Sequence, residues 1–286
     1  MQIDVSLAIG ASVLMHVCWN LMARQLPQKS TPLWWVLLTH LLLFAPYGIY
    51  TLVNEVHWSI EFSGVLLVSA LANAIYFYAL YRAYQYASVA FVYPLVRSSP
   101  ILIALWAFLF FDNSLAMSSW LGIGLNVLGL MLMARSGKSG NEKYAMPWAM
   151  IAMLATSIYS LSDKAATAHV SSITGLLGYI SLGYFFSWCA ISIQLFKETG
   201  SWIPAERIKP MPMLIGGICI GWAYALIIFA MKHLHAAEVV AYSNAGIILA
   251  TLFSIFMFQE KWQWKSRLVS VGMITAGLLM IALGKP

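Results

Sequence analysis

The sequence predicts an all-α integral membrane protein with ten transmembrane helices, arranged as two inverted five-helix repeats. Hydrophobic residues make up 61% of the 286 positions and charged residues only 9%, whereas soluble domains carry about 25% charged residues. Long apolar segments recur along the whole chain, and the second half repeats the pattern of the first. Lipid around the apolar faces is the environment that fits this composition.

A membrane-spanning helix needs about 20 mostly apolar residues. Ten segments qualify: 4–23, 32–53, 63–82, 88–111, 117–134, 146–165, 173–196, 211–231, 237–258 and 267–284. The segments are too long for transmembrane strands and lack their alternation. The polar stretches between them have the length of loops, so we expect a compact helical bundle without a soluble domain.

Short motifs in the first half recur in the same order in the second half. The matched pairs are HVCWN with YSLSD, YFYAL with WAYAL, and LFFDNS with MFQEKW. Their separation grows from 143 residues for His16 and Tyr159 to 148 residues for Asp112 and Glu260, a drift that short loop insertions can absorb.

These matches divide the chain into a first repeat, 1–140, and a second repeat, 145–286, which together form one transport unit. Each repeat has five helices, an odd number, so the second enters the membrane upside down relative to the first. Inverted repeats of this kind are typical of secondary transporters, whose site lies where the halves meet.

Lysine and arginine predict the orientation of the chain. Twelve of the 16 lie in the loops after the odd-numbered helices: Arg24, Lys29, Arg82, Arg135, Lys138, Lys143, Lys197, Arg207, Lys209, Lys261, Lys265 and Arg267. We therefore expect these loops in the cytoplasm, both termini outside, and the protein in the cell inner membrane. The net charge of +6 reflects this topology, so no nucleic-acid partner is predicted.

The two five-helix halves, the acidic residue that ends the fourth and ninth spans, and the glycine-containing helix after each resemble the drug/metabolite transporter superfamily, in particular its EamA family. The opening HVCWNLMAR followed by PLWW resembles a narrower group of permeases associated with phosphonate utilisation. The resemblance implies a ten-helix bundle with a central cavity that moves a solute by alternating access without ATP. Members of the superfamily commonly have both termini in the cytoplasm, the reverse of the orientation that the charges predict here.

Two polar faces match between the repeats. Three residues at i, i+3 and i+4 share one face of the first helix, and three with the same spacing share one face of the sixth: His16, Trp19 and Asn20, and Tyr159, Ser162 and Asp163. We predict that both faces line one cavity and bind substrate. The alternative is that they hydrogen-bond across packed helices. His16 and Asp163 are the candidates for proton coupling.

Arg97 lies deep in the fourth span, between Pro94 and Pro100. Its guanidinium could bind a carboxylate or phosphonate bidentately; alternatively, carbonyls freed by the prolines or Asp163 could satisfy it. Lys164 either faces the cavity or extends to the membrane surface. Together these groups predict a neutral to positive site, which favours an anionic or zwitterionic solute.

Aromatic side chains are expected to form walls of the site. The matched positions of the third and eighth spans, together with an amide early in the ninth, complete the predicted substrate-binding set: Tyr76, Tyr78, Trp222, Tyr224 and Asn244. Other aromatics near the ends of spans are interpreted as residues of the membrane interface: Trp34, Trp35, Trp58, Trp262 and Trp264.

For the remaining reactive side chains, the sequence favours no catalytic or metal-binding role. Glu238 is either a proton-coupling acid or, as we favour, a solvated loop charge. Cys18, Cys189 and Cys219 are expected to be packing residues without a disulfide. No catalytic or metal-binding motif is present, so no catalytic residue, metal or cofactor is predicted.

The sequence therefore predicts a secondary active transporter for a small zwitterionic or anionic solute, phosphonate-like or amino-acid-like. Protons or another coupling solute and membrane lipids are the expected partners, and one chain is expected to suffice. An exporter of amino acids, aromatic ones included, or of other metabolites is the first alternative. A non-transporting lipid scramblase or a membrane-embedded enzyme is the more distant one.

Overall fold

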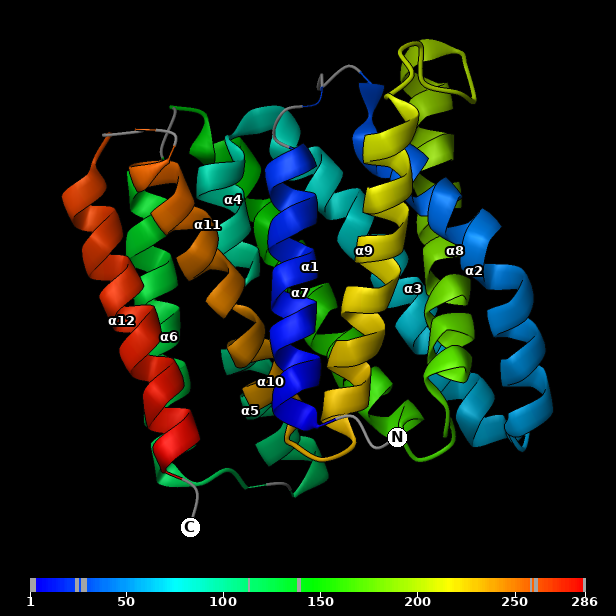
Figure 1. Ribbon diagram of the computed structural model, residues 1–286, viewed down its shortest axis with the longest axis horizontal. Coiled ribbons are helices and arrows are strands. Elements are labelled where there is room, and N and C mark those ends of the chain that lie inside the picture. Colours follow the sequence, from blue (N-terminus) through cyan, green and yellow to red (C-terminus); the bar gives the residue numbers. More distant parts are fainter. Residues whose placement is uncertain are drawn as a thin grey trace. The chain divides into compact units, whose positions relative to one another are not determined.

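Every regular element of the described chain is a helix (Figure 1). The computed structural model describes residues 4–23, 26, 30–112, 114–137, 140–257, 259 and 262–284, without the side chains of Asn20, Leu21 and Ala23. Within these ranges nine helical spans are long and apolar enough to cross a membrane, and α1 (Val5–Ala23) is a further apolar helix. The predicted all-helical, multi-pass membrane architecture is confirmed.

The chain forms two compact units. Unit 1 contains Met1–Tyr78 and Ser162–His233, and unit 2 contains Ala79–Leu161 and Leu234–Pro286. The boundaries fall inside α3 (Ile60–Tyr86) and α7 (Glu142–Ala166). Each unit therefore combines segments of both predicted repeats, and the repeats themselves, 1–140 and 145–286, remain a prediction.

Unit 1 is built around α2 (Pro32–Glu55), α8 (Ile173–Thr199) and α9 (Pro210–Met231). α2 packs against α8 and α9, and α1 packs against α9 (Figure 1). Proline begins α2 and α9, where its missing N–H is not needed. Ser172 caps α8 by accepting the Gly175 N–H at 2.8 Å, and Gly200 ends α8 with a φ of 72°.

The α2–α8 crossing depends on two glycines. A Cβ on Gly178 would lie 2.1 Å from the Gly48 carbonyl oxygen, and a Cβ on Gly48 would lie 2.7 Å from the Gly178 nitrogen. The two backbones therefore touch, which is how small residues bring membrane helices together.

Trp34 belongs to the core of unit 1. It is only 4% exposed, its indole donates to Ser192 Oγ at 2.8 Å, and its ring packs against Trp188. The prediction that it is a membrane-interface aromatic is wrong. It fails because α2 begins at Pro32, which turns Trp34 toward α8.

Unit 2 is organised by α6 (Met117–Ser136) and α12 (Trp264–Leu283), which run side by side (Figure 1). A Cβ on Gly122 would meet the Gly277 carbonyl oxygen at 2.6 Å, and a Cβ on Gly277 would meet the Gly122 carbonyl oxygen at 2.5 Å. Unit 2 therefore uses the same kind of glycine crossing as unit 1.

Two spans of unit 2 are broken near their middle. The first divides into α4 (Val89–Val96) and α5 (Pro100–Phe111), and the second into α10 (Ala236–Ser243) and α11 (Ala245–Phe256). In both, a helix of 8 residues is followed by one of 12. The sequence predicted two continuous spans, 88–111 and 237–258, and missed both breaks.

Candidate functional site

Asp163, near the end of α7, is a fully buried ionisable group of unit 1, 0% exposed. Two hydroxyls donate to its Oδ1: Ser69 Oγ of α3 at 2.5 Å and the Tyr179 hydroxyl of α8 at 3.0 Å. The Tyr224 hydroxyl of α9 donates to Oδ2. Three different helices thus direct O–H donors at one carboxylate, and among the described residues none of its hydrogen-bond partners is a cation.

Aromatic side chains surround this carboxylate within unit 1. Tyr76, Trp222 and Tyr224 all pack against the buried core that contains Tyr179 and Tyr184. Of the site residues predicted here, Tyr224 is the one with a hydrogen bond to Asp163; Tyr76 and Trp222 pack against the apolar core. Tyr78, half-buried, occupies the last position of the first segment of unit 1, and Ser162 the first position of the second.

His16 and Trp19 lie at the contact between α1 and α9. His16 Nδ1 is 3.0 Å from the Ser12 carbonyl oxygen one turn earlier, and Ser12 Oγ donates to the Ala223 carbonyl at 2.8 Å. A Cβ on Gly216 of α9 would lie 2.6 Å from the Trp19 ring, so this glycine makes room for the indole. The side chain of Asn20 lies outside the described part of the chain, and so does Glu260.

Lys164 extends along the end of α7, and its ammonium donates to the carbonyl of Met231, the last residue of α9. A cation at a helix C-terminus is favourable, because the last carbonyls of a helix have no partner within it. Neither predicted role of Lys164, facing the cavity or extending to the membrane surface, included this bond, and both remain predictions.

A second buried titratable group in α2 went unnoticed in the sequence. His40 is 0% exposed, its Nε2 is 3.1 Å from Ser181 Oγ, and its ring lies edge-on to Tyr184. A Cβ on Gly221 would lie 2.0 Å from the imidazole, so the glycine of α9 is what allows the ring to fit.

At one end of unit 1, Glu55 faces the beginning of α8. Ser171 Oγ donates to Glu55 Oε2 at 3.3 Å, and Lys232 Nζ donates to the Ser171 carbonyl at 2.7 Å. Burial lowers the pKa of the Lys232 ammonium, an effect that the charge of Glu55 opposes. This cluster secures the loop before α8.

In unit 2 the two helix breaks are bonded to each other. Arg97 Nη2 donates to the Ser243 carbonyl at 3.1 Å, and Asn244 Nδ2 donates to the Arg97 carbonyl at 3.2 Å. Asn244 Nδ2 also donates to Asn126 Oδ1 of α6 at 2.8 Å. We call this set, Arg97, Asn126, Ser243 and Asn244, the clasp.

The clasp follows from the backbone at each break. Pro100 has no N–H, and the Ile101 N–H turns to the Ser98 carbonyl, so the Arg97 carbonyl is left for Asn244. In the other span the Ile247 N–H bonds to the Asn244 carbonyl, which leaves the Ser243 carbonyl for Arg97. Buried carbonyls need partners, and here each break supplies the side chain that the other one needs.

Arg97 was predicted either to bind an anion of the solute or to be satisfied by a carbonyl or by Asp163. A carbonyl partner, that of Ser243, is present in unit 2. The guanidinium also lies over the Tyr93 ring, with 5.4 Å from Cζ to the ring centroid. Asp163, the other partner considered, belongs to unit 1, so a pairing between the two stays a prediction. Tyr159 is buried in the part of α7 that belongs to unit 2, so the face it was predicted to share with Asp163 also remains a prediction.

Glu238 is buried, contrary to the prediction from the sequence. It is 2% exposed in the first turn of α10, where Ser119 Oγ of α6 donates to its Oε1 at 2.6 Å. The favoured reading, a solvated loop charge, is wrong. The helix begins at Ala236, two residues before Glu238, and this places the carboxylate on the face that packs against α6.

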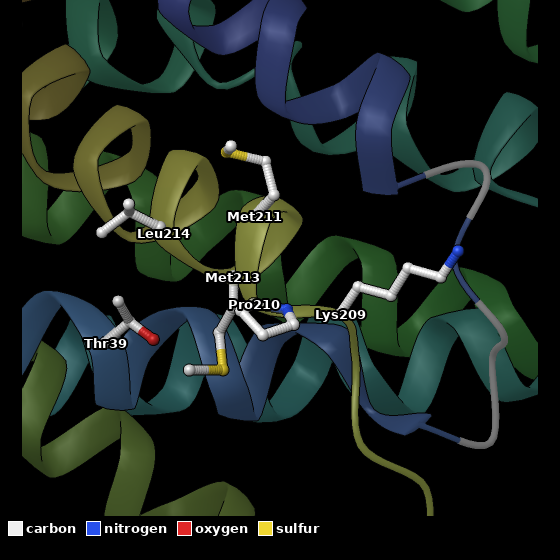
Figure 2. A pocket seen from close by; sticks show the side chains of 6 residues that line it. All are labelled: Thr39, Lys209, Pro210, Met211, Met213 and Leu214. Carbon is white, nitrogen blue, oxygen red and sulfur yellow. The ribbon is translucent and has the colours of Figure 1, made fainter.

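An apolar groove of about 670 Å³ lies where α9 begins beside α2 (Figure 2). Its lining residues are Thr39, Lys209, Pro210, Met211, Met213 and Leu214. The Thr39 hydroxyl is bonded to the Trp35 carbonyl, and Figure 2 shows Lys209 extending away from Thr39 and Leu214. None of the predicted site residues lines this groove.

Among the described residues, no three His, Cys, Asp or Glu side chains gather at one place. Cys18, Cys189 and Cys219 are all free thiols.

Comparison with known proteins supports a membrane transporter, the class of protein that the apolar helical spans suggest. Residues 4–135 match the model of the EamA-like transporter family. No curated protein sequence matches the chain. A solved structure described as "Crystal structure of protein" is 18% identical, with a TM-score of 0.70, and the match covers 98% of this chain and 97% of that one. At that identity the likeness shows the fold.

Several residues of these clusters were not found from the sequence: Ser69, Tyr179, His40 and Asn126. Serine and tyrosine are common enough in membrane helices that no spacing distinguished Ser69 and Tyr179. Asn126 and His40 carried the one usable signal, a strongly polar side chain in the middle of an apolar span.

Proposed function

We propose that this protein is a secondary active transporter that moves a small zwitterionic or anionic organic solute across the inner membrane by alternating access. The EamA-like match of residues 4–135 and the nine apolar spans support this class. We further propose that one chain is the functional unit, that both termini lie outside, and that neither catalysis nor nucleic-acid binding belongs to its function.

The observation that carries the proposal is the Asp163 cluster. A carboxylate inside a membrane helix costs roughly 2.5–3.5 kcal/mol on insertion scales, and three hydroxyl donors fix its position without neutralising it. A group retained at that cost in a transporter-like fold is suited to bind a proton or a cationic group.

Protonation of Asp163 would change the hydrogen-bond pattern around it. The ionised carboxylate only accepts, and it accepts from Ser69, Tyr179 and Tyr224. A protonated carboxyl must also donate, so at least one of these hydroxyls would have to turn. Because these three hydroxyls come from α3, α8 and α9, the charge of the Asp163 carboxylate is linked to the packing of three helices. Proton-coupled transport requires such a link. We propose His16 as the second proton-coupling group.

We propose a phosphonate-like or amino-acid-like solute, recognised by the polar and aromatic residues assigned above. They are His16, Trp19, Asn20, Tyr76, Tyr78, Arg97, Tyr159, Ser162, Asp163, Trp222, Tyr224 and Asn244. The positive charge of Arg97 supports an anionic group on the solute.

Reconstitution into liposomes tests the proposal. With an imposed pH gradient, the protein is expected to accumulate a radiolabelled phosphonate or amino acid from a broad panel several-fold above empty liposomes. Asp163→Asn is expected to abolish accumulation, whereas Glu198→Gln, the same carboxylate-to-amide change at an exposed helix end, is expected to leave it intact.

The same liposomes separate the alternatives. Efflux of preloaded amino acids, aromatic ones included, would identify an exporter. Rapid scrambling of a fluorescent lipid without flux of any solute would contradict the transporter proposal and support a scramblase.

A further inference from the structure

The clasp of unit 2 leaves polar atoms without partners. Arg97 Nε, Asn126 Nδ2, Asn244 Oδ1 and Ser99 Oγ are all buried and have no hydrogen-bond partner within the described residues. Ser99, Asn126 and Asn244 are each 0% exposed. Native proteins pair nearly all their buried polar atoms, so four at one place need an explanation.

Three of these residues are joined by hydrogen bonds, and the fourth, Ser99, follows close in the chain. Asn244 bonds to both Arg97 and Asn126, and Ser99 is the residue at which α5 begins, two positions after Arg97. The clasp uses Arg97 Nη2 and Asn244 Nδ2 to satisfy the carbonyls at the ends of α4 and α10. What remains lies beside the beginnings of α5 and α11.

The remaining atoms favour an anion. Arg97 Nε–H and Asn126 Nδ2 can only donate, Ser99 Oγ can donate, and Asn244 Oδ1 is the single atom that can only accept. Arg97 is positively charged, and its contacts in the described chain are a carbonyl and an aromatic ring.

We propose that this site binds the carboxylate or phosphonate group of the solute, with Ser99, Asn126 and the Arg97 Nε–H as its donors. The residues that bond the two breaks together also form the ligand site, so the bound anion would hold α4–α5 and α10–α11 in the clasped arrangement. The proposal rests on the proposed function only in taking the ligand to be the transported solute.

Two adjacent serines provide a matched test. Ser98 and Ser99 are both buried, but Ser98 Oγ donates to the Pro94 carbonyl at 3.0 Å, whereas Ser99 Oγ has no hydrogen-bond partner in the part of the chain that the structure describes. Removing an unpaired buried hydroxyl should not lower the unfolding temperature of the free protein, and removing a paired one should. If Ser99 contacts the anion, Ser99→Ala should weaken binding without loss of stability, and Ser98→Ala should do the reverse.

Binding is measured on the full chain in neutral-detergent micelles, which contain no lipid phosphate. The probes are methylphosphonate and acetate, with acetamide as the neutral comparator and chloride to match ionic strength. We expect methylphosphonate and acetate to raise the unfolding temperature of the wild type with concentration. Acetamide and chloride should not. Calorimetric titration should give an affinity at least 5-fold weaker for Ser99→Ala and within 2-fold of wild type for Ser98→Ala.

A third variant reverses the character of one donor. Asn126→Asp keeps the Oδ1 that accepts from Asn244 and replaces the free amide nitrogen by oxygen, so it should abolish anion binding while the protein stays folded. Wild-type affinity in Ser99→Ala and Asn126→Asp, or no anion-specific stabilisation of the wild type, would overturn the proposal. Anion binding without flux would contradict the transport function alone, and flux that both variants leave unchanged would contradict this site alone.

Discussion

Units 1 and 2 are packed alike but differ in their polar centres. In each, a pair of glycines lets two long helices touch, Gly48 with Gly178 and Gly122 with Gly277. The centre of unit 1 is an acceptor, the Asp163 carboxylate, surrounded by three donors. The centre of unit 2 is a set of donors around a cation, several of them still unpaired.

The difference separates two roles that a buried polar group can have. The Asp163 carboxylate already accepts from three hydroxyls, and a change of its own charge would rearrange these bonds, which suits a coupling group. An unsaturated set of donors changes when something binds to it, which suits recognition of a solute. If the two units differ in this way, substitutions in them should have different effects on packing, on hydrogen bonds and on transport.

The largest expected effect concerns the shared packing device. Gly178→Ala and Gly277→Ala each force a Cβ against a backbone oxygen at 2.1–2.5 Å, and we expect each to lower the free energy of unfolding by about 3 kcal/mol. Gly272→Ala, in the same helix as Gly277 but with nothing within 4 Å of its Cβ, should leave stability unchanged or raise it by up to ~1 kcal/mol. Thermal unfolding in micelles measures all three variants. Equal stability of Gly277→Ala and Gly272→Ala would contradict the claim that a close glycine contact holds α6 and α12 together.

A smaller effect tests whether the donors around Asp163 differ from ordinary buried hydroxyls. Tyr179→Phe removes a bond to the carboxylate, and Tyr184→Phe removes a bond of 3.1 Å to the Ile220 carbonyl in the same core. Bonds to charged groups contribute about 1.5–3 kcal/mol and neutral ones about 1 kcal/mol. Chemical unfolding should therefore show a larger loss for Tyr179→Phe. The reverse order would indicate that Asp163 is not held as a carboxylate.

The sequence predicted the membrane class and the positions of the spans, because apolar length alone determines both. It also predicted Asp163 and Arg97 as site residues, since charged residues are costly in lipid. The partners of Asp163 could not be predicted, because Ser69 and Tyr179 are distant in sequence and ordinary in composition.

The helix breaks show the same limit. Pro94 and Pro100 marked the first span as irregular, but the second break, at Asn244, has no proline beside it. It arises because Arg97 takes the Ser243 carbonyl, a contact between residues 146 positions apart. Glu238 was misread for a related reason: its burial depends on where α10 begins and on Ser119 of α6.

The most direct test of the two roles compares exchange with accumulation in the same liposomes. Exchange of labelled for unlabelled solute at equal pH needs recognition but no coupling, whereas accumulation against a gradient needs both. We predict that Asp163→Asn retains exchange at a rate within a few-fold of wild type and loses accumulation. Arg97→Gln is predicted to lose both by at least about 10-fold, the effect of roughly 1.4 kcal/mol of binding energy. Wild-type accumulation by Asp163→Asn, or undiminished exchange by Arg97→Gln, would contradict the assignment of coupling to Asp163 and of anion recognition to Arg97.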